Sequence, residues 1–383
     1  MEQTKGRRFR LVVMVTSTME TASTLDQATL DALRESVAGV LAEQCDSTTL
    51  HAFIDTKNTL DKTLWAQAAQ LGWLGFGIPE QFGGLGMGAQ GLAILHGELG
   101  RQSAPGPYIA TLSAAQTIVE TGDEAARQKW LPRLASGEIS ATVPATLDAR
   151  NLTRSDAGVS GTLRCLGARD AAILVAPTDD AWVIVDLAGA EVTTAPMWDR
   201  TRDVIDVRLK DAPPIGIFPD AAATRAALTR ALALAVAADS AGGARSITER
   251  TIAYMKTREQ FGQPIAGFQA LKHRAADLAT KLAVADEMVR HAVQRTVADE
   301  PDAELWATLA KSEVTEACVF VTTDCVQLHG GVGFTWDFDP HIFLKRARLN
   351  EVLIMANTAL RDHAAAALAA ITAAGRSALE LEL

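Results

Sequence analysis

A long, regular stripe of small and aliphatic residues constrains the fold of this chain more than any other feature of its sequence. The spacing alternates between four and three residues, through Leu271, Ala275, Leu278, Leu282, Ala285, Val289 and Ala292. Because this spacing keeps one face of an α-helix apolar over many turns, it predicts a long helix packed against other helices. Aromatic residues are only 5% of the chain, so the core must be mostly aliphatic. The pattern favours a helical bundle.

The pattern of apolar residues changes twice along the 383 residues of the chain. Residues 25–138 show apolar positions at helical spacing, and residues 217–383 are helical and rich in alanine. Between them, in 139–216, short β-branched runs predict strands; the clearest are 172–175, 182–185 and 204–209. The connections between these runs are too short for crossover helices, so the sheet should be antiparallel or mixed. The predicted fold is mainly α, with a small, short and degenerate middle β domain.

Helix boundaries follow from proline and glycine. Helical spacing predicts helices over 59–71 and 90–99 in the first region, separated by a glycine-rich loop. In the last region, one helix should start near Pro264, a second should open at Pro301 and stop at Gly330-Gly331. A final continuous helix is expected from about residue 350 to 374.

Composition narrows the classes of partner and compartment. The net charge is −10, which argues against nucleic acid or an anionic membrane surface as a general partner. No run of about 18 apolar residues is present, so no membrane span is predicted. The apolar run at 11–15 is shorter than a signal peptide needs, and we expect residues 1–24 to be a flexible leader. Four cysteines without a C-x-x-C pair favour the reducing cytoplasm.

Several local motifs are weak. The glycines of 86–91 match G-x-G-x-x-G, but no strand precedes them and no acidic residue follows at the spacing of a dinucleotide fold. His329, Asp337, Asp339 and His341 are close in sequence, yet Pro340 breaks the helical alignment that a metal site would use, and we expect no metal. No G-x-S-x-G elbow is present, which removes the nucleophile of a common hydrolase class.

Two segments carry a more specific signal. Residues 257–269 read Thr-Arg-Glu-Gln-Phe-Gly-Gln-Pro-Ile-Ala-Gly-Phe-Gln, an interhelix turn with Arg258, Phe261 and Gln269 at fixed offsets. Residues 327–334 read Gln-Leu-His-Gly-Gly-Val-Gly-Phe, a helix that ends in glycines open to close approach. Each segment alone could equally be a turn followed by a helix cap.

Together these segments resemble the acyl-CoA dehydrogenase family. The loop 79–86, Pro-Glu-Gln-Phe-Gly-Gly-Leu-Gly, and the following Glu98-Leu99-Gly100-Arg101 are similar to that family as well. The resemblance covers roughly residues 25–370 and is strongest over 245–350. It implies an N-terminal helical domain, a middle β domain and a C-terminal four-helix bundle. This is the same order that the pattern of apolar residues predicts.

The resemblance also implies chemistry. Family members use FAD to oxidise an acyl-CoA to a 2-enoyl-CoA: a carboxylate takes the α-proton and the flavin takes the β-hydrogen as hydride. Electrons then pass to an electron-transfer flavoprotein or a similar acceptor. In the usual tetramer each FAD lies between subunits, and one subunit holds its ADP half. By the resemblance, the residues of this ADP edge are Arg258, Phe261, Gln269, Gln327, Gly330 and Gly331.

The flavin-ring side departs from the family pattern. The family's Thr-Glu-Pro loop corresponds to residues 140–150, which contain no Thr-Glu-Pro, and the Trp-Ile-Thr strand corresponds to Cys165-Leu166-Gly167. The usual base position falls on Ile354, and the threonine after it on Ala356. The alternative base position, on the first bundle helix, falls on Leu232. Asp239, seven residues later on the same helical face, is a candidate displaced base, although a structural carboxylate would also explain it. Glu351, one turn before Ile354, is no better a candidate for the base.

Three hypotheses follow. The first is a subunit of a heteromeric, α2β2 acyl-CoA dehydrogenase of the bacterial steroid side-chain type, which lends its ADP edge to a second family subunit that carries the base. The second is a self-sufficient homotetrameric enzyme with Asp239 as base. The third is a non-catalytic scaffold that keeps the fold and binds no FAD. The retained Arg258 and Gly330-Gly331 argue against the third hypothesis, and the missing base argues against the second.

Overall fold

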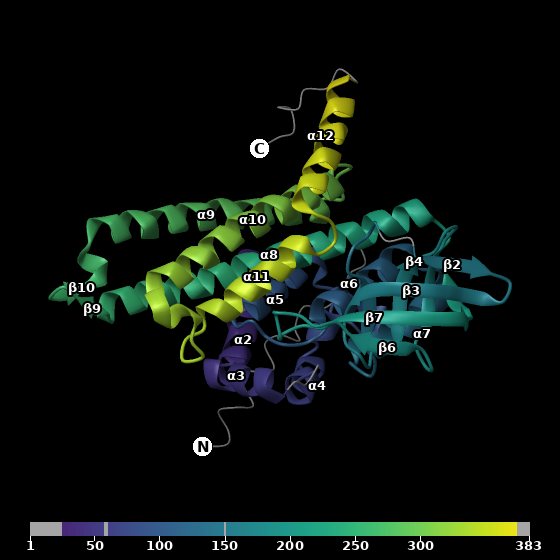
Figure 1. The fold of residues 1–383 in the computed structure, drawn as a ribbon. Coiled ribbons are helices and arrows are strands. Elements are labelled where there is room, and N and C mark those ends of the chain that lie inside the picture. The colour runs from purple at the N-terminus through teal and green to yellow at the C-terminus, as the bar shows by residue number, and fades with distance from the viewer. Residues whose placement is uncertain (1–24, 57–59, 149–150, 374–383) are drawn as a thin grey trace.

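The computed structural model describes residues 25–56, 60–148 and 151–373, and the leader expected at 1–24 lies outside them. Helices form both ends of this part of the chain and a sheet lies between them in sequence (Figure 1). The mainly α fold class with a small middle β domain is confirmed. The N-terminal helices are α2 (Gln27–Gln44), α3 (Ser47–Thr56), α4 (Lys62–Gln70), α5 (Gly88–Arg101), α6 (Tyr108–Thr121) and α7 (Glu124–Ala135).

Aspartate caps set where several of these helices begin. The helix expected over 59–71 starts instead at Lys62, because the Asp61 carboxylate accepts hydrogen bonds from the backbone N–H groups of Thr63 and Leu64. Such a side chain satisfies backbone donors that the first helical turn leaves free. The helix expected over 90–99 lies within α5.

Eight of the described strands, β1 to β8, form one sheet in the order β6-β7-β3-β1-β4-β5-β8, with β2 paired to β3. The predicted runs are confirmed as β4 (Ile173–Pro177), β5 (Trp182–Asp186) and β7 (Val204–Ala212). The pair β1–β4 is parallel and the other pairs are antiparallel, so the sheet is mixed. The remaining strands are β1 (Ala141–Pro144), β2 (Leu152–Ser155), β3 (Gly158–Leu166), β6 (Glu191–Thr194) and β8 (Pro214–Ile217).

The long helix α8 (Ala221–Thr257) is the centre of the molecule. It packs against α10 (Ala303–His329), α5 and α6, and α9 (Gln269–Val297) lies beside α10 (Figure 1). Glycines allow α5 to approach closely: a Cβ on Gly100 would lie 2.1 Å from the backbone oxygen of Asp239 on α8. By length and composition α8 could cross a membrane, but 61% of its most apolar window is buried inside the protein, as in the core helix of a folded domain.

The predicted stripe faces the core of the bundle. Leu278, Leu282, Ala285 and Ala292 are buried on α9, and Leu271 and Val289 pack partly buried against the same core. Helix α10 begins at Ala303, two residues after Pro301, and Gly330 caps its end as expected. The stop at Gly330 is confirmed, but neither proline lies within a first helical turn: Pro301 precedes the cap residue Asp302, and α9 begins at Gln269, five residues after Pro264.

The single helix expected from 350 to 374 is wrong. The chain forms α11 (Pro340–Val352) and α12 (Asn357–Ala373), with a break at residues 353–356. Ile354 adopts φ +73°, a left-handed conformation that an α-helix does not allow and that is costly for a β-branched residue. Contacts with the sheet domain hold this conformation, which no local pattern indicates. Helix α12 turns away from the bundle and projects from the body of the molecule (Figure 1).

Candidate functional site

The turn that carries Arg258 begins where α8 ends. Two short strands, β9 (Glu259–Gln260) and β10 (Gln263–Pro264), pair antiparallel around Phe261 and Gly262. Both tip residues have positive φ, +54° for Phe261 and +79° for Gly262, as a tight two-residue hairpin turn requires. Phe261 is 92% exposed. An aromatic ring that is both conformationally strained and exposed to water is unfavourable for an isolated chain, and it marks a surface that meets another molecule.

The end of α10 lies next to this turn. The rings of Tyr254, one turn before Arg258, and His329, directly before Gly330, stack with centroids 4.4 Å apart and planes 15° from parallel. Gly330 has φ +66°, and no atom lies within 4 Å of the position where a Cβ would stand on Gly330 or Gly331. The backbone around both glycines is therefore accessible. The structure thus brings the two sequence segments together.

The side chains of the edge are available for a ligand. Arg258, Gln269 and Gln327 are exposed, and within the described residues no carboxylate forms an ion pair with Arg258. A free guanidinium beside open glycine backbone suits a pyrophosphate, and the Phe261 ring offers an apolar face to a base. These residues fit the ADP half of FAD.

The ring side does not fit. The segment that corresponds to the Thr-Glu-Pro loop pairs directly with the segment that corresponds to the family's base position. The N–H of Leu147 donates to the carbonyl of Ile354 at 2.8 Å, and the N–H of Ile354 donates to the carbonyl of Ala145 at 2.7 Å. This parallel bridge between Thr146 and Ile354 joins the sheet domain to the end of α11. Leu147 and Ile354 are each only 1% exposed, so these two segments are buried against each other, with backbone hydrogen bonds and aliphatic side chains between them.

Lys311 holds the closing segment in place, a residue that the sequence analysis missed. It is fully buried on α10, and its Nζ donates to the carbonyls of Glu351 and Met355 and to the Asn357 side chain, at 2.8–2.9 Å. Burial lowers the pKa of Lys311 to about 8. The polar neighbours Ser312 and Glu313 gave no local sign that the Lys311 side chain would be buried.

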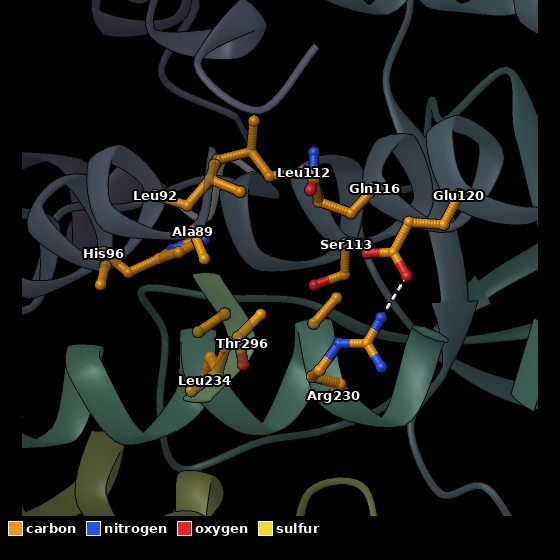
Figure 2. A pocket seen from close by; sticks show the side chains of 13 residues that line it. Ala89, Leu92, His96, Leu112, Ser113, Gln116, Glu120, Arg230, Leu234 and Thr296 are labelled. Atoms are coloured by element: carbon orange, nitrogen blue, oxygen red, sulfur yellow. Dashed lines mark hydrogen bonds and ion pairs between the residues drawn. The ribbon is translucent and has the colours of Figure 1, made fainter. Parts of the chain in front are cut away.

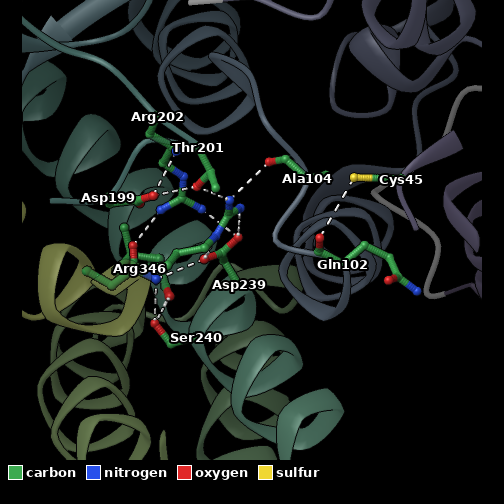
Figure 3. Close-up of polar contacts among 11 residues, drawn as sticks. Cys45, Gln102, Ala104, Asp199, Thr201, Arg202, Asp239, Ser240 and Arg346 are labelled. Atoms are coloured by element: carbon green, nitrogen blue, oxygen red, sulfur yellow. Dashed lines mark hydrogen bonds and ion pairs between the residues drawn. The ribbon is translucent and has the colours of Figure 1, made fainter. Parts of the chain in front are cut away.

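The expectation that Asp239 could serve as a displaced base is corrected by its surroundings. Its side chain is 1% exposed and accepts hydrogen bonds from Arg346 at 2.6 Å, from Arg202 at 2.5 Å and from Asn350 at 2.8 Å (Figure 3). Burial by itself raises the pKa of Asp239, but the two guanidinium groups outweigh it, and the net pKa lies below the ordinary carboxyl value. A carboxylate with its lone pairs engaged and a lowered pKa is a poor proton acceptor.

The pairing around Asp239 is structural. Arg346 on α11 also donates to the carbonyl of Ala104 at 3.0 Å and to the Thr201 hydroxyl at 2.9 Å (Figure 3). The cluster therefore ties α8 and α11 to the N-terminal domain and to the connection between β6 and β7 of the sheet domain. Its two arginines lie far from Asp239 in sequence, so spacing along α8 could not show them.

The two family base positions, Leu232 and Ile354, carry no proton acceptor, and Glu351 is engaged elsewhere. Leu232 and Ile354 are buried aliphatic side chains, and Glu351 forms an ion pair with Arg348 at 3.1 Å. In the described part of the chain, no group of three or more His, Cys, Asp or Glu residues is placed to hold a metal ion. Asp339, which the sequence analysis weighed as a metal ligand, instead accepts hydrogen bonds from Ser47 and Arg250 and contacts His51. The four cysteines are buried and free.

Comparison with known proteins agrees with this organisation. Residues 27–138 match the model for the acyl-CoA dehydrogenase N-terminal domain, and residues 222–376 match that for the acyl-CoA dehydrogenase C-terminal domain. The acyl-CoA dehydrogenase IpdE2 of Mycolicibacterium smegmatis is 30% identical over 319 residues, 82% of this chain and 91% of the relative.

Two further relatives extend the comparison. Acyl-CoA dehydrogenase FadE34 of Mycobacterium tuberculosis is 33% identical over 301 residues, 75% of this chain, and the chain spans only 39% of that relative's length. Among solved structures, the Tcur3481-Tcur3483 steroid ACAD, in a variant form, superposes with a TM-score of 0.83 at 25% identity, covering 90% of this chain and 99% of the matched one.

Proposed function

The chain belongs to the acyl-CoA dehydrogenase family, and we propose that it is one half of a heteromeric acyl-CoA dehydrogenase, lending its ADP edge to FAD held by a catalytic partner. Members of the family are FAD-dependent oxidoreductases that act on the CH–CH bond of acyl-CoA. The observation that carries the proposal is a contrast within one chain: open backbone at Gly330 and Gly331, where we place the ADP edge, and the Thr146–Ile354 bridge, which we infer closes the ring site.

The distance between the two sites supports sharing between subunits. Leu232, one of the base positions, lies on helix α8, and Arg258 directly follows the end of that helix, 26 residues later. At a rise of 1.5 Å per residue this separation is about 39 Å, which is longer than one extended FAD molecule. One chain therefore cannot hold both ends of the same cofactor, and the ADP edge must face the ring site of another subunit. The two ends of α8 lie at opposite sides of the molecule (Figure 1).

The partner must provide what this chain lacks. Bound flavin supplies the hydride acceptor; the subunit around its ring must supply a carboxylate base and a loop that contacts the ring. Here the base positions are Leu232 and Ile354, and the ring-side loop is paired to the main chain of α11's end. We therefore place the base and the ring pocket on a second family subunit that retains both, in an α2β2 assembly.

The alternative hypotheses are less well supported. A self-sufficient enzyme would need Asp239 as base, but that carboxylate is engaged by Arg202 and Arg346. A scaffold that binds no FAD would have no use for an exposed, strained Phe261 or for an unpaired guanidinium beside Gly330. The heteromeric hypothesis explains both the engaged Asp239 and the exposed residues around Gly330.

We extend the proposal to substrate and acceptor. One similar solved structure is named a steroid ACAD, and on that likeness we propose a lipid or steroid acyl-CoA as substrate, with electrons passing to an electron-transfer flavoprotein or a similar acceptor. The four free cysteines are consistent with the cytoplasm as compartment.

The test uses the full chain, first alone and then co-expressed with a family member that retains the glutamate and the Thr-Glu-Pro loop. Alone, the chain should purify without a flavin absorbance band, and addition of acyl-CoA should cause no change in its visible absorbance. The co-purified complex should be yellow, and its flavin band should bleach on addition of a suitable acyl-CoA. A yellow single chain whose flavin is reduced by acyl-CoA would overturn the proposal.

A further inference from the structure

Three aromatic rings lie together beside the proposed ADP edge. Tyr254 belongs to the last turn of α8, His329 is the last residue of α10, and Phe338 lies between the short helix η4 (Gly330–Phe334) and α11. Besides the stack of Tyr254 on His329, Phe338 meets both rings edge-on, with centroids 5.7 Å from Tyr254 and 5.8 Å from His329. Stacked and edge-on pairs are both favourable arrangements of aromatic rings. The cluster therefore joins the ends of two bundle helices.

On the α8 side, the cluster is tied to Arg258 through the backbone. The N–H of Arg258 donates to the carbonyl of Tyr254 at 2.8 Å, as the last hydrogen bond of the helix. The carbonyl of Arg258 in turn accepts from the N–H of Ile265 at 2.8 Å, which closes the hairpin turn. Both backbone groups of Arg258 are thus engaged. Where Tyr254 is held, the backbone from which the guanidinium extends is held as well.

On the α10 side, His329 anchors the residue before the open glycines. Its Nδ1 atom lies 2.8 Å from the carbonyl oxygen of Cys325, which can only accept, so Nδ1 carries the proton and donates. His329 is buried, and burial lowers its pKa, so the ring is neutral near pH 7. No atom lies within 4 Å of a Cβ placed on Gly330 or Gly331. The place of this glycine backbone is therefore set by the anchored residue that precedes it.

The distance between the two halves of the edge matters for binding. A pyrophosphate that accepts hydrogen bonds from Arg258 and from the backbone at Gly330 needs both at fixed positions, and affinity is lost when contacts must be ordered on binding. The stack of Tyr254 on His329 links these halves directly. In the part of the chain that the structure describes, the Tyr254 hydroxyl forms no hydrogen bond, so the ring alone makes the link.

We propose, building on the function proposed above, that Tyr254 is a positioning residue of the ADP edge: its stack on His329 fixes Arg258 relative to Gly330, so that both meet one pyrophosphate. Tyr254 acts through these two residues. The role requires an aromatic ring at this position and does not require the hydroxyl group.

The first measurement is the dissociation constant of FAD for the heteromer, followed by flavin fluorescence. Tyr254→Leu should raise this constant about three- to tenfold, the effect of one aromatic pair, whereas Tyr254→Phe keeps the ring and should bind as wild type does. In an Arg258→Ala background, Tyr254→Leu should raise it at most about twofold further, because a residue that acts through Arg258 is not additive with it. Full additivity, or equal affinity of wild type and Tyr254→Leu, would overturn the proposal.

A control variant on the same helix separates positioning from a general loss of stability. Leu234 is buried on α8, 20 residues or about 30 Å before Tyr254, and lines the small cavity between α5, α6 and α8 that Figure 2 shows. Leu234→Ala should lower the melting temperature at least as much as Tyr254→Leu and leave FAD affinity unchanged. If FAD affinity fell with the melting temperature in both variants alike, Tyr254 would act through stability alone and the proposal would fail.

The second measurement needs neither FAD nor the partner. Hydrogen–deuterium exchange of the single chain, read by mass spectrometry, should become faster in Tyr254→Leu over both 256–263 and 327–334, because the stack holds both segments. Tyr254→Phe and Leu234→Ala should exchange there as wild type does. Unchanged exchange in either segment of Tyr254→Leu would contradict the proposal. A wild-type heteromer without FAD would overturn the proposed function itself, whereas normal FAD affinity in Tyr254→Leu would overturn only the role of Tyr254.

Discussion

Among single residues, substitution of Asp239 tests whether its carboxylate has a structural role or acts as the catalytic base. Its carboxylate balances two buried guanidinium groups, so Asp239→Asn should cost about 3–5 kcal/mol of unfolding free energy by leaving Arg202 and Arg346 without their anion. Turnover of the heteromer should stay within a few-fold of wild type. Urea unfolding and steady-state kinetics measure the two effects.

The matched control for this variant is Asp206→Asn, which removes an exposed ion pair with Arg164 and should cost no more than about 1 kcal/mol. A true base would behave in the opposite way. A loss of about 10²- to 10⁴-fold in rate at unchanged stability would restore Asp239 as the catalytic carboxylate.

His96 gives the protein a predictable dependence on pH. Its pKa is lowered to about 4 by burial, while in the unfolded chain it is near 6.5. Below pH 6.5 the unfolded state therefore binds a proton that the folded state does not, and stability falls as pH drops towards 4. Between pH 7 and 5 this residue should remove about 2 kcal/mol.

Comparison of wild type with His96→Gln isolates that contribution, because the other titrating groups are common to both proteins. The difference in unfolding free energy between pH 7 and 5 should be smaller in the variant by this amount. Identical pH dependence of the two proteins would show that His96 titrates normally in the folded state.

At the scale of elements, the ADP edge depends on the end of α8. Arg258→Ala removes a charge-assisted contact with pyrophosphate and should weaken FAD binding to the heteromer by about 1.5–3 kcal/mol. FAD occupancy and dissociation constant, measured by fluorescence, check the prediction. Arg208→Ala on β7, an exposed arginine of the sheet, is the control and should bind FAD normally. Full FAD affinity in Arg258→Ala would mean that the turn is purely structural.

The break between α11 and α12 depends on one buried ammonium group. Lys311→Met would leave the carbonyls of Glu351 and Met355 and the Asn357 side chain without their donor. Because an unsatisfied buried group costs about 1–3 kcal/mol, the variant should be destabilised by at least about 2 kcal/mol in urea unfolding. Lys281→Met on the exposed face of α9 should have little effect. Equal stability of the two variants would contradict the role given to Lys311.

For the whole molecule, asymmetry between subunits predicts cofactor stoichiometry. Each pair of unlike subunits has one interface in which an intact ring pocket faces the Arg258 edge, whereas the reverse interface would use the ring site closed at Thr146 and Ile354. The heteromer should therefore hold about one FAD per pair of chains. The number of FAD molecules per chain is obtained by dividing the amount of released flavin, measured by absorbance, by the amount of protein. One FAD per chain would show that the closed site opens in the assembly.

Local patterns in the sequence were enough to determine most of the elements. The stripe from Leu271 to Ala292 is the buried face of α9, and the β-branched runs are strands, because periodicity and turn residues act over a few neighbouring positions. The residues that we propose for the ADP edge, and the absence of a glutamate at Ile354 and Leu232, could also be named from the sequence, since each is a matter of which residue stands at a given position of a short motif.

Only the tertiary structure decided the state of the ring site and the role of Asp239. The Thr146–Ile354 bridge, the contacts of Lys311 and the pairing of Asp239 with Arg346 join residues that are far apart in the chain. Their formation depends on how the sheet domain and the bundle pack, and the left-handed Ile354 that breaks the last helix is held by those contacts. Helical periodicity predicts a continuous helix there because it describes only neighbours on one element, whereas the break is stabilised from another domain.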